Sequence, residues 1–168
     1  MKPNQIEILK FGTRYGILTG IIGILFTSIL ISLDMLYSQS IEKSILGFIV
    51  LIVPIIFTIY TFRKKNNSLI VEQAIGVGVI TALVAAIVTI LFTYLLTNFI
   101  LPDFWDNSAA YNKILLQEQN PAITIEELNE YITLKRKMYW ITYPIILLFN
   151  LCIGFVVSLL SGILLKTK

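Results

Sequence analysis

The residues of this chain that most suggest chemistry are the three carboxylates Glu126, Glu127 and Glu130. Clustered carboxylates could bind a metal ion or act as a general acid and base. At helical spacing, however, Glu126 and Glu130 share one face while Glu127 points elsewhere. The chain also has no histidine to complete such a site. We interpret the three as a solvated helix face, and predict no catalytic residue, no metal site, no cofactor and no enzymatic activity.

Three other candidate sites have plainer interpretations. Asp34 could be a charge at the mouth of a pore, but a residue in the turn after a helix explains it as well. Gly76-Val77-Gly78 lacks the third glycine and the preceding strand of a nucleotide-binding loop. Cys152 is the one cysteine, so it cannot form an internal disulfide, and we expect it to be a small apolar core residue.

The elements that would position any site are four long uncharged segments. We predict membrane-spanning helices at about residues 13–33, 44–62, 73–101 and 138–165, because about 20 apolar residues cross the hydrocarbon core. A hydrophobic content of 57% and a mean hydropathy of +0.83 exceed what a soluble domain of this size can bury. The prediction is an all-α, four-transmembrane-helix bundle forming a single domain, residues 1–168. The last two spans are the longer pair, which predicts that they tilt or protrude.

The distribution of basic residues predicts the orientation. The two termini and the Arg63–Lys65 loop together carry eight of the Lys and Arg residues, whereas the other two loops carry five. Because basic loops stay in the cytoplasm, we predict that both termini are cytoplasmic. The Lys135–Lys137 cluster in the long loop 102–137 is the one feature that disagrees.

Small residues recur at four-residue spacing in three of the spans, which allows neighbouring helices to approach closely. These candidate packing residues are Gly12, Gly16 and Gly20 in the first span, Gly78, Ala82 and Ala86 in the third, and Gly154, Ser158 and Gly162 in the fourth. They could form a dimerisation face. Ordinary packing inside the bundle is the alternative, and three such faces among four helices favour it.

The loop of residues 102–137 is the only sizeable polar element. We expect a short helix over 108–119, a break at Asn120-Pro121, and a second helix that starts with a capping box formed by Thr124 and Glu127. An apolar stripe on the second helix predicts that it lies on the membrane surface or folds back on the bundle. The loop could bind an external partner, or could simply cover the outer end of the bundle.

From Tyr15 onward the spans contain no charged residue, which argues against ion-coupled transport and proton relays. Among their polar residues, Asn150 stands out as a candidate intramembrane contact, either through an interhelical hydrogen bond or to a substrate. A passive pore or small-solute carrier would require Thr89, Thr93, Asn98 and Asn150 to converge on one cavity. We expect instead a non-enzymatic subunit or accessory protein that acts by helix–helix or partner association, as a homo-oligomer or with another membrane protein in the lipid bilayer, and without nucleic acid.

Several of these features resemble a family of small bacterial four-span membrane proteins catalogued as a domain of unknown function. They are Phe11-Gly12, the glycines Gly16, Gly20 and Gly23, the basic turn Arg63-Lys64-Lys65, and the long loop from Tyr111 to Tyr131. The resemblance implies a bacterial inner membrane, that is, the cytoplasmic membrane. It implies no activity and carries no functional residues to this chain.

Overall fold

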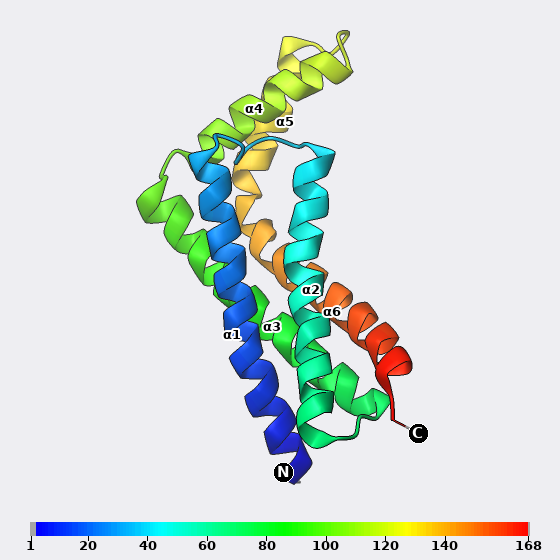
Figure 1. Ribbon diagram of the computed structural model, residues 1–168. Coiled ribbons are helices and arrows are strands. Elements are labelled where there is room, and N and C mark those ends of the chain that lie inside the picture. The colour runs from blue at the N-terminus through cyan, green and yellow to red at the C-terminus, as the bar shows by residue number, and fades with distance from the viewer. Residues whose placement is uncertain (1–2, 168) are drawn as a thin grey trace.

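The computed structural model describes residues 3–167, and within that range every regular element is a helix. Its four long helices are α1 (Pro3–Ser32), α2 (Ile41–Asn66), α3 (Val71–Leu95) and α6 (Thr142–Leu165), shown in Figure 1. A π-helical segment, η1 (Leu96–Ile100), extends α3, and a 3-10 turn, η2 (Tyr139–Ile141), precedes α6. The helices α4 (Phe104–Gln119) and α5 (Ile125–Lys137) form a hairpin between them. All four long helices are long and apolar enough to cross a membrane, which makes this a multi-pass membrane protein.

The helices do not divide clearly into two short and two long spans. The segments long and apolar enough to cross a membrane have 28, 26, 30 and 27 residues in chain order. The charged residues that end an apolar run do not end its helix, so α1 continues through Lys10 and Arg14. Helix α2 stops instead at Asn67, whose φ of 52° lies in the left-handed region that terminates helices.

Helix α3 is the centre of the arrangement. It packs most extensively against α1 on one side and α6 on the other, while α2 contacts all three. In Figure 1, α3 runs obliquely past α1 and α2, and the N- and C-terminal marks lie at the same end. We call this the termini end, and the opposite end the hairpin end. Lys2 and Lys168, which enter the charge count, lie outside the described residues.

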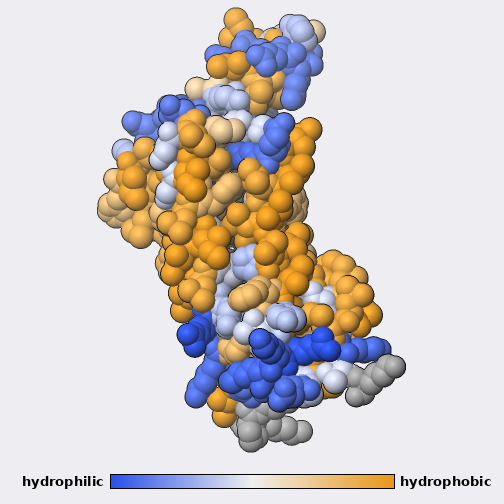
Figure 2. Space-filling view, viewed as in Figure 1, coloured by the Kyte–Doolittle hydropathy of each residue, from blue (hydrophilic) through white to orange (hydrophobic). Residues whose placement is uncertain are grey.

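The surface of the four long helices is apolar over its middle. Figure 2 shows this apolar zone between a polar rim at the termini end and the polar hairpin. Large aliphatic side chains point outward within it: Leu25 is 58% exposed, Leu91 59% and Leu164 82%. A soluble protein rarely exposes a contiguous apolar surface of this size to water. We therefore interpret it as the surface that contacts lipid.

The hairpin stands away from the long helices. Figure 1 shows α4 and α5 projecting beyond the hairpin end, so this segment does not fold back on the long helices, which was one of the two expected arrangements. The apolar stripe of α5 is only partly covered: Leu128 is fully buried beside α4, where Ala109 is 7% exposed, whereas Ile125 is 71% exposed. An ion pair of 2.8 Å between Arg136 and Asp106 joins the same two helices.

The predicted capping box at the start of α5 is confirmed. The Glu127 backbone N–H donates to the Thr124 hydroxyl oxygen at 3.2 Å, and the Thr124 N–H donates to a Glu127 carboxylate oxygen at 3.0 Å. These bonds, the backbone one first, lower the pKa of the Glu127 carboxyl.

We predict that acid loosens the first turn of α5. Because the folded state depresses the pKa of Glu127, its contribution to stability is present above the ordinary carboxyl pKa and is lost as pH falls through the lowered value. Amide hydrogen exchange at residues 125–128, corrected for its intrinsic pH dependence, should show protection falling below about pH 4.

Glu127→Gln is the matched control, since glutamine also completes a capping box but does not titrate. Its protection should stay flat with pH. An equal acid response in this variant would show that other groups cause the loosening.

Candidate functional site

The glycine face of α1 lies directly against α3. A Cβ atom added at Gly12 would meet Ile80 Cγ2 at 2.7 Å, one at Gly16 would meet Val84 Cβ at 2.6 Å, and one at Gly20 would meet Val88 Cβ at 2.6 Å. Each glycine thus receives one side chain of a ridge on α3. The contacts move toward the C-terminal end of both helices together, from Gly12 with Ile80 to Gly20 with Val88, so α1 and α3 run parallel.

The other side of α3 meets α6 in the same manner, with the chain directions opposed. A Cβ at Gly78 would collide with the Ser158 side chain, and one at Gly154 would collide with Ala82. A Cβ at Gly162 would lie 2.9 Å from the Ala74 Cβ. The hydroxyl of Ser158 is buried in this contact and donates to the Gly154 carbonyl within α6, so its hydrogen-bonding requirement is met inside its own helix.

All nine candidate packing residues are buried inside the chain. Eight of them line the two α3 contacts, and Ala86, one turn beyond Ala82, is also fully buried. The structure therefore places these residues between helices of one molecule. Sequence reasoning missed the facing ridge of Ile80, Val84 and Val88, although its four-residue spacing matches that of the glycines.

The termini end is closed by packed side chains. Ile55, Ile59, Phe62 and Leu69 are fully buried there, and the Phe11 ring meets the Phe62 ring edge-on at 5.3 Å.

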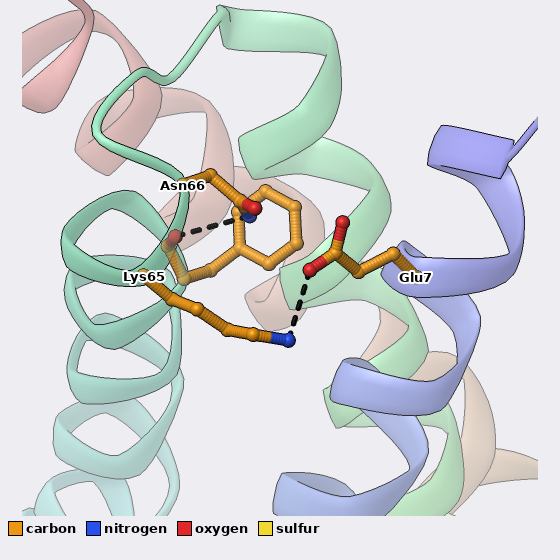
Figure 3. Close-up of polar contacts among 4 residues, drawn as sticks. Glu7, Lys65 and Asn66 are labelled. Atoms are coloured by element: carbon orange, nitrogen blue, oxygen red, sulfur yellow. Dashed lines mark hydrogen bonds and ion pairs between the residues drawn. The ribbon is translucent and has the colours of Figure 1, made fainter.

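Polar contacts at the surface also link the chain segments of the termini end to one another. Figure 3 shows Lys65 reaching from α2 to Glu7 on α1, with Nζ 2.9 Å from the carboxylate. Thr167 holds the C-terminal segment to the α2–α3 loop, where it exchanges two hydrogen bonds with the Leu69 backbone at 2.8 and 2.9 Å. Sequence reasoning gave no sign of this tie.

A cleft of about 400 Å³ opens among all four long helices in their hairpin-end half. We call it the four-helix cleft. Thr89 and Asn150 are among its lining residues, whereas Thr93 and Asn98 are not. Asn98 is exposed and donates to the Tyr94 carbonyl at 2.8 Å. The four residues required for a pore therefore do not converge.

Asn150 does not make the expected interhelical hydrogen bond through its amide nitrogen. That nitrogen donates to the Ile146 carbonyl at 2.8 Å, one turn earlier on the same helix. Such local bonds satisfy an amide at membrane depth without a partner helix.

Cys152 is exposed, so the expectation of a core residue is wrong. It precedes the buried Gly154 by two positions, which turns it about 200° around α6, away from α3. Asp34 has a φ of 53° just after α1, as a turn residue does, and Gly76 and Gly78 lie within α3 rather than in a loop.

The carboxylates of α5 lie on the surface of the hairpin. Glu126, Glu127 and Glu130 are exposed, and Glu127 is engaged by Thr124. Among residues 3–167 no three metal-binding side chains lie close enough to hold an ion.

We predict that Gly16→Leu destabilises the protein by about 1–3 kcal/mol, the usual effect of overfilling a packed contact. The added Cβ alone would lie 2.8 Å from the Thr81 carbonyl oxygen, which is backbone and cannot move aside. Gly47→Ala is the control, since nothing lies within 4 Å of its Cβ position. The control should change stability by about 1 kcal/mol or less. Reversible unfolding in mixed micelles, followed by circular dichroism, measures both, and equal stability of the two variants would contradict the close α1–α3 contact.

Comparison with known proteins gives one match. No curated protein and no solved structure matches the chain. A family model described as "Protein of unknown function (DUF4199)" matches residues 14–167, which include most of α1 and all later helices. The resemblance expected from the sequence is thereby confirmed. This chain belongs to the DUF4199 family of proteins of unknown function.

Proposed function

We propose that this protein is a non-enzymatic subunit or accessory of the bacterial cytoplasmic membrane, and that it acts by binding another membrane protein through the α4–α5 hairpin. The observation that carries this proposal is that the α4–α5 hairpin projects beyond the long helices and carries exposed aliphatic side chains. The small-residue faces cannot serve this purpose, because α1, α3 and α6 use them on one another.

The hairpin is held rigidly enough to present a surface. Its own helices are joined by the buried Leu128 and by the Arg136–Asp106 ion pair. Near its base, the Gln39 amide of the α1–α2 loop donates to the Asn112 side-chain oxygen at 2.7 Å. The rings of Tyr37 and Phe104 lie 5.6 Å apart across the same junction.

The outer half of the hairpin carries the exposed apolar and acidic side chains that would contact a partner protein. Ile114 is 56% exposed and Ile125 is 71% exposed, and both belong to the half of the hairpin farther from the long helices. Glu118, Glu126 and Glu130 are exposed in the same half. A partner surface that fits would offer an apolar patch with basic residues around it.

A pore or small-solute carrier has less support. Thr89 and Asn150 do share the four-helix cleft, but the packed core around Ile59 and Phe62 closes the termini end. A conducting path would have to displace fully buried side chains there.

The charge distribution supports a cytoplasmic location for both termini. The exposed residues Lys10, Arg14, Lys64 and Lys65 lie at the termini end, while the loop of residues 102–137 carries six of the ten Asp and Glu residues. By the positive-inside rule, the hairpin then faces the outside of the cytoplasmic membrane.

We predict that a membrane-impermeant maleimide added to intact cells labels Ala122→Cys in the hairpin and does not label Ser68→Cys in the α2–α3 loop. Both positions are exposed, and Cys152 is replaced by serine in each variant. Ser68→Cys should react only after the cells are permeabilised. Labelling of Ser68→Cys alone in intact cells would reverse the proposed orientation.

We predict that Ile114→Ser with Ile125→Ser removes the partner contact. A photoreactive residue at Gln117 in the full-length protein should crosslink one and the same membrane protein in repeated native-membrane preparations, and the double substitution should reduce that yield at least tenfold. A loss of this size is typical of removing central apolar contacts.

Asn129→Ser, another exposed change on the hairpin, is the control and should leave the yield unchanged. A protein that stays monomeric and uncrosslinked after mild extraction would contradict the proposed association.

A further inference from the structure

A second cleft, of about 390 Å³, lies where the hairpin joins the membrane-spanning part. We call it the junction cleft. Its walls come from α4 through Trp105, from α5 through Lys135 and Arg136, and from η2 and α6 through Tyr139 and Ile145. It combines basic, aromatic and aliphatic groups, unlike the four-helix cleft, whose lining has no charged residue.

The basic groups of the junction cleft are available to an anion. Lys135 forms no ion pair within the described part of the chain, and its Nζ lies 5.3 Å from the centre of the Tyr131 ring. Arg136 is paired with Asp106, but both side chains are more than half exposed, so the pair is weak and leaves other guanidinium donors open.

One of the four candidate membrane spans begins at the junction cleft. The membrane-spanning segment begins at Tyr139, so Ile141 and Ile145 belong to it while Lys135 and Arg136 precede it. The Trp105 and Tyr139 rings lie 5.4 Å apart at this level, where aromatic residues favour the lipid–water interface. A ligand that fits both walls has an anionic head and an apolar tail.

We propose that the junction cleft binds an anionic phospholipid, with the headgroup phosphate at Lys135 and Arg136 and one acyl chain along Ile141 and Ile145. Basic side chains close to the apolar boundary are suited to lipid phosphates. The charge order along α5 agrees: its acidic residues are at the far end and its basic residues at the membrane end. Lipid binding also explains the Lys135–Lys137 cluster, which disagrees with the positive-inside pattern. The lipid-binding proposal is independent of the partner protein proposed for the hairpin and of the proposed cytoplasmic location of the termini.

Trp105 can report the bound lipid directly. The chain has two tryptophans, and Trp140 lies outside the cleft lining. Trp140→Phe therefore leaves Trp105 as the only indole. The protein is reconstituted in phosphatidylcholine vesicles with a small fraction of phosphatidylglycerol or phosphatidylcholine brominated on its acyl chains, and Trp105 quenching is measured for each.

We expect phosphatidylglycerol to be preferred over phosphatidylcholine about fivefold or more, the contribution of one basic residue near an anionic headgroup. Lys135→Gln should remove most of this preference, and Lys135→Arg should keep it. Lys113→Gln removes the same charge from α4 outside the cleft and should leave the preference intact.

Three results would overturn the proposal. Equal quenching by the two lipids would mean that only unselective boundary lipid is present. An equal loss in Lys113→Gln would show a general effect of net charge. Competition by millimolar inorganic phosphate at constant ionic strength would make free phosphate, rather than a lipid, the ligand.

Discussion

The close approach of α3 to two neighbours at once is the constraint on which the rest of the structure depends. Lipid is as apolar as the side chains, so helices in a membrane associate through packing rather than through exclusion of water. Close packing of that kind requires that at least one of the two facing surfaces has few protruding side chains. Helix α3 meets it twice, offering the ridge of Ile80, Val84 and Val88 to the glycines of α1, and its own small face to Gly154 and Gly162 of α6. The two contacts occupy opposite sides of the same helix, so they can be made at the same time.

This arrangement divides the molecule into two unlike ends. At the termini end, the α2 residues Ile59 and Phe62 complete the packing around α3, and ties through Lys65 and Thr167 fasten the helix ends. At the hairpin end the four-helix cleft leaves the helices less tightly filled. The elements that we propose meet other molecules, namely the hairpin and the junction cleft, are both at this open end. A rigid base with a projecting element is the physical basis of the association that we propose.

The sequence predicts the large-scale architecture because its signals are local. Long uncharged runs specify membrane helices, small residues at four-residue spacing specify close contacts, and Thr124 with Glu127 specifies a helix start. It does not specify how each apolar helix is rotated about its own axis, or the direction in which the hairpin projects. The side of α6 on which Cys152 lies is set by Gly154 facing α3, and in a uniformly apolar helix no polar face announces it. The contacts that the hairpin receives from Gln39 and Tyr37 likewise come from residues far away in the chain, so no local pattern predicts them.

Use of the small-residue faces within one molecule is the central claim, and a disulfide between α3 and α6 tests it most directly. In a Cys152→Ser background, Ala74→Cys and Gly162→Cys place two thiols where a Cβ atom added at Gly162 would lie 2.9 Å from that of residue 74, so the helices need only move apart by about 0.9 Å to reach the usual disulfide spacing of about 3.8 Å. Mild oxidation in native membranes should give a disulfide within a single chain, seen as a monomer of altered mobility at all expression levels. A disulfide-linked dimer, or no disulfide at all, would contradict the claim.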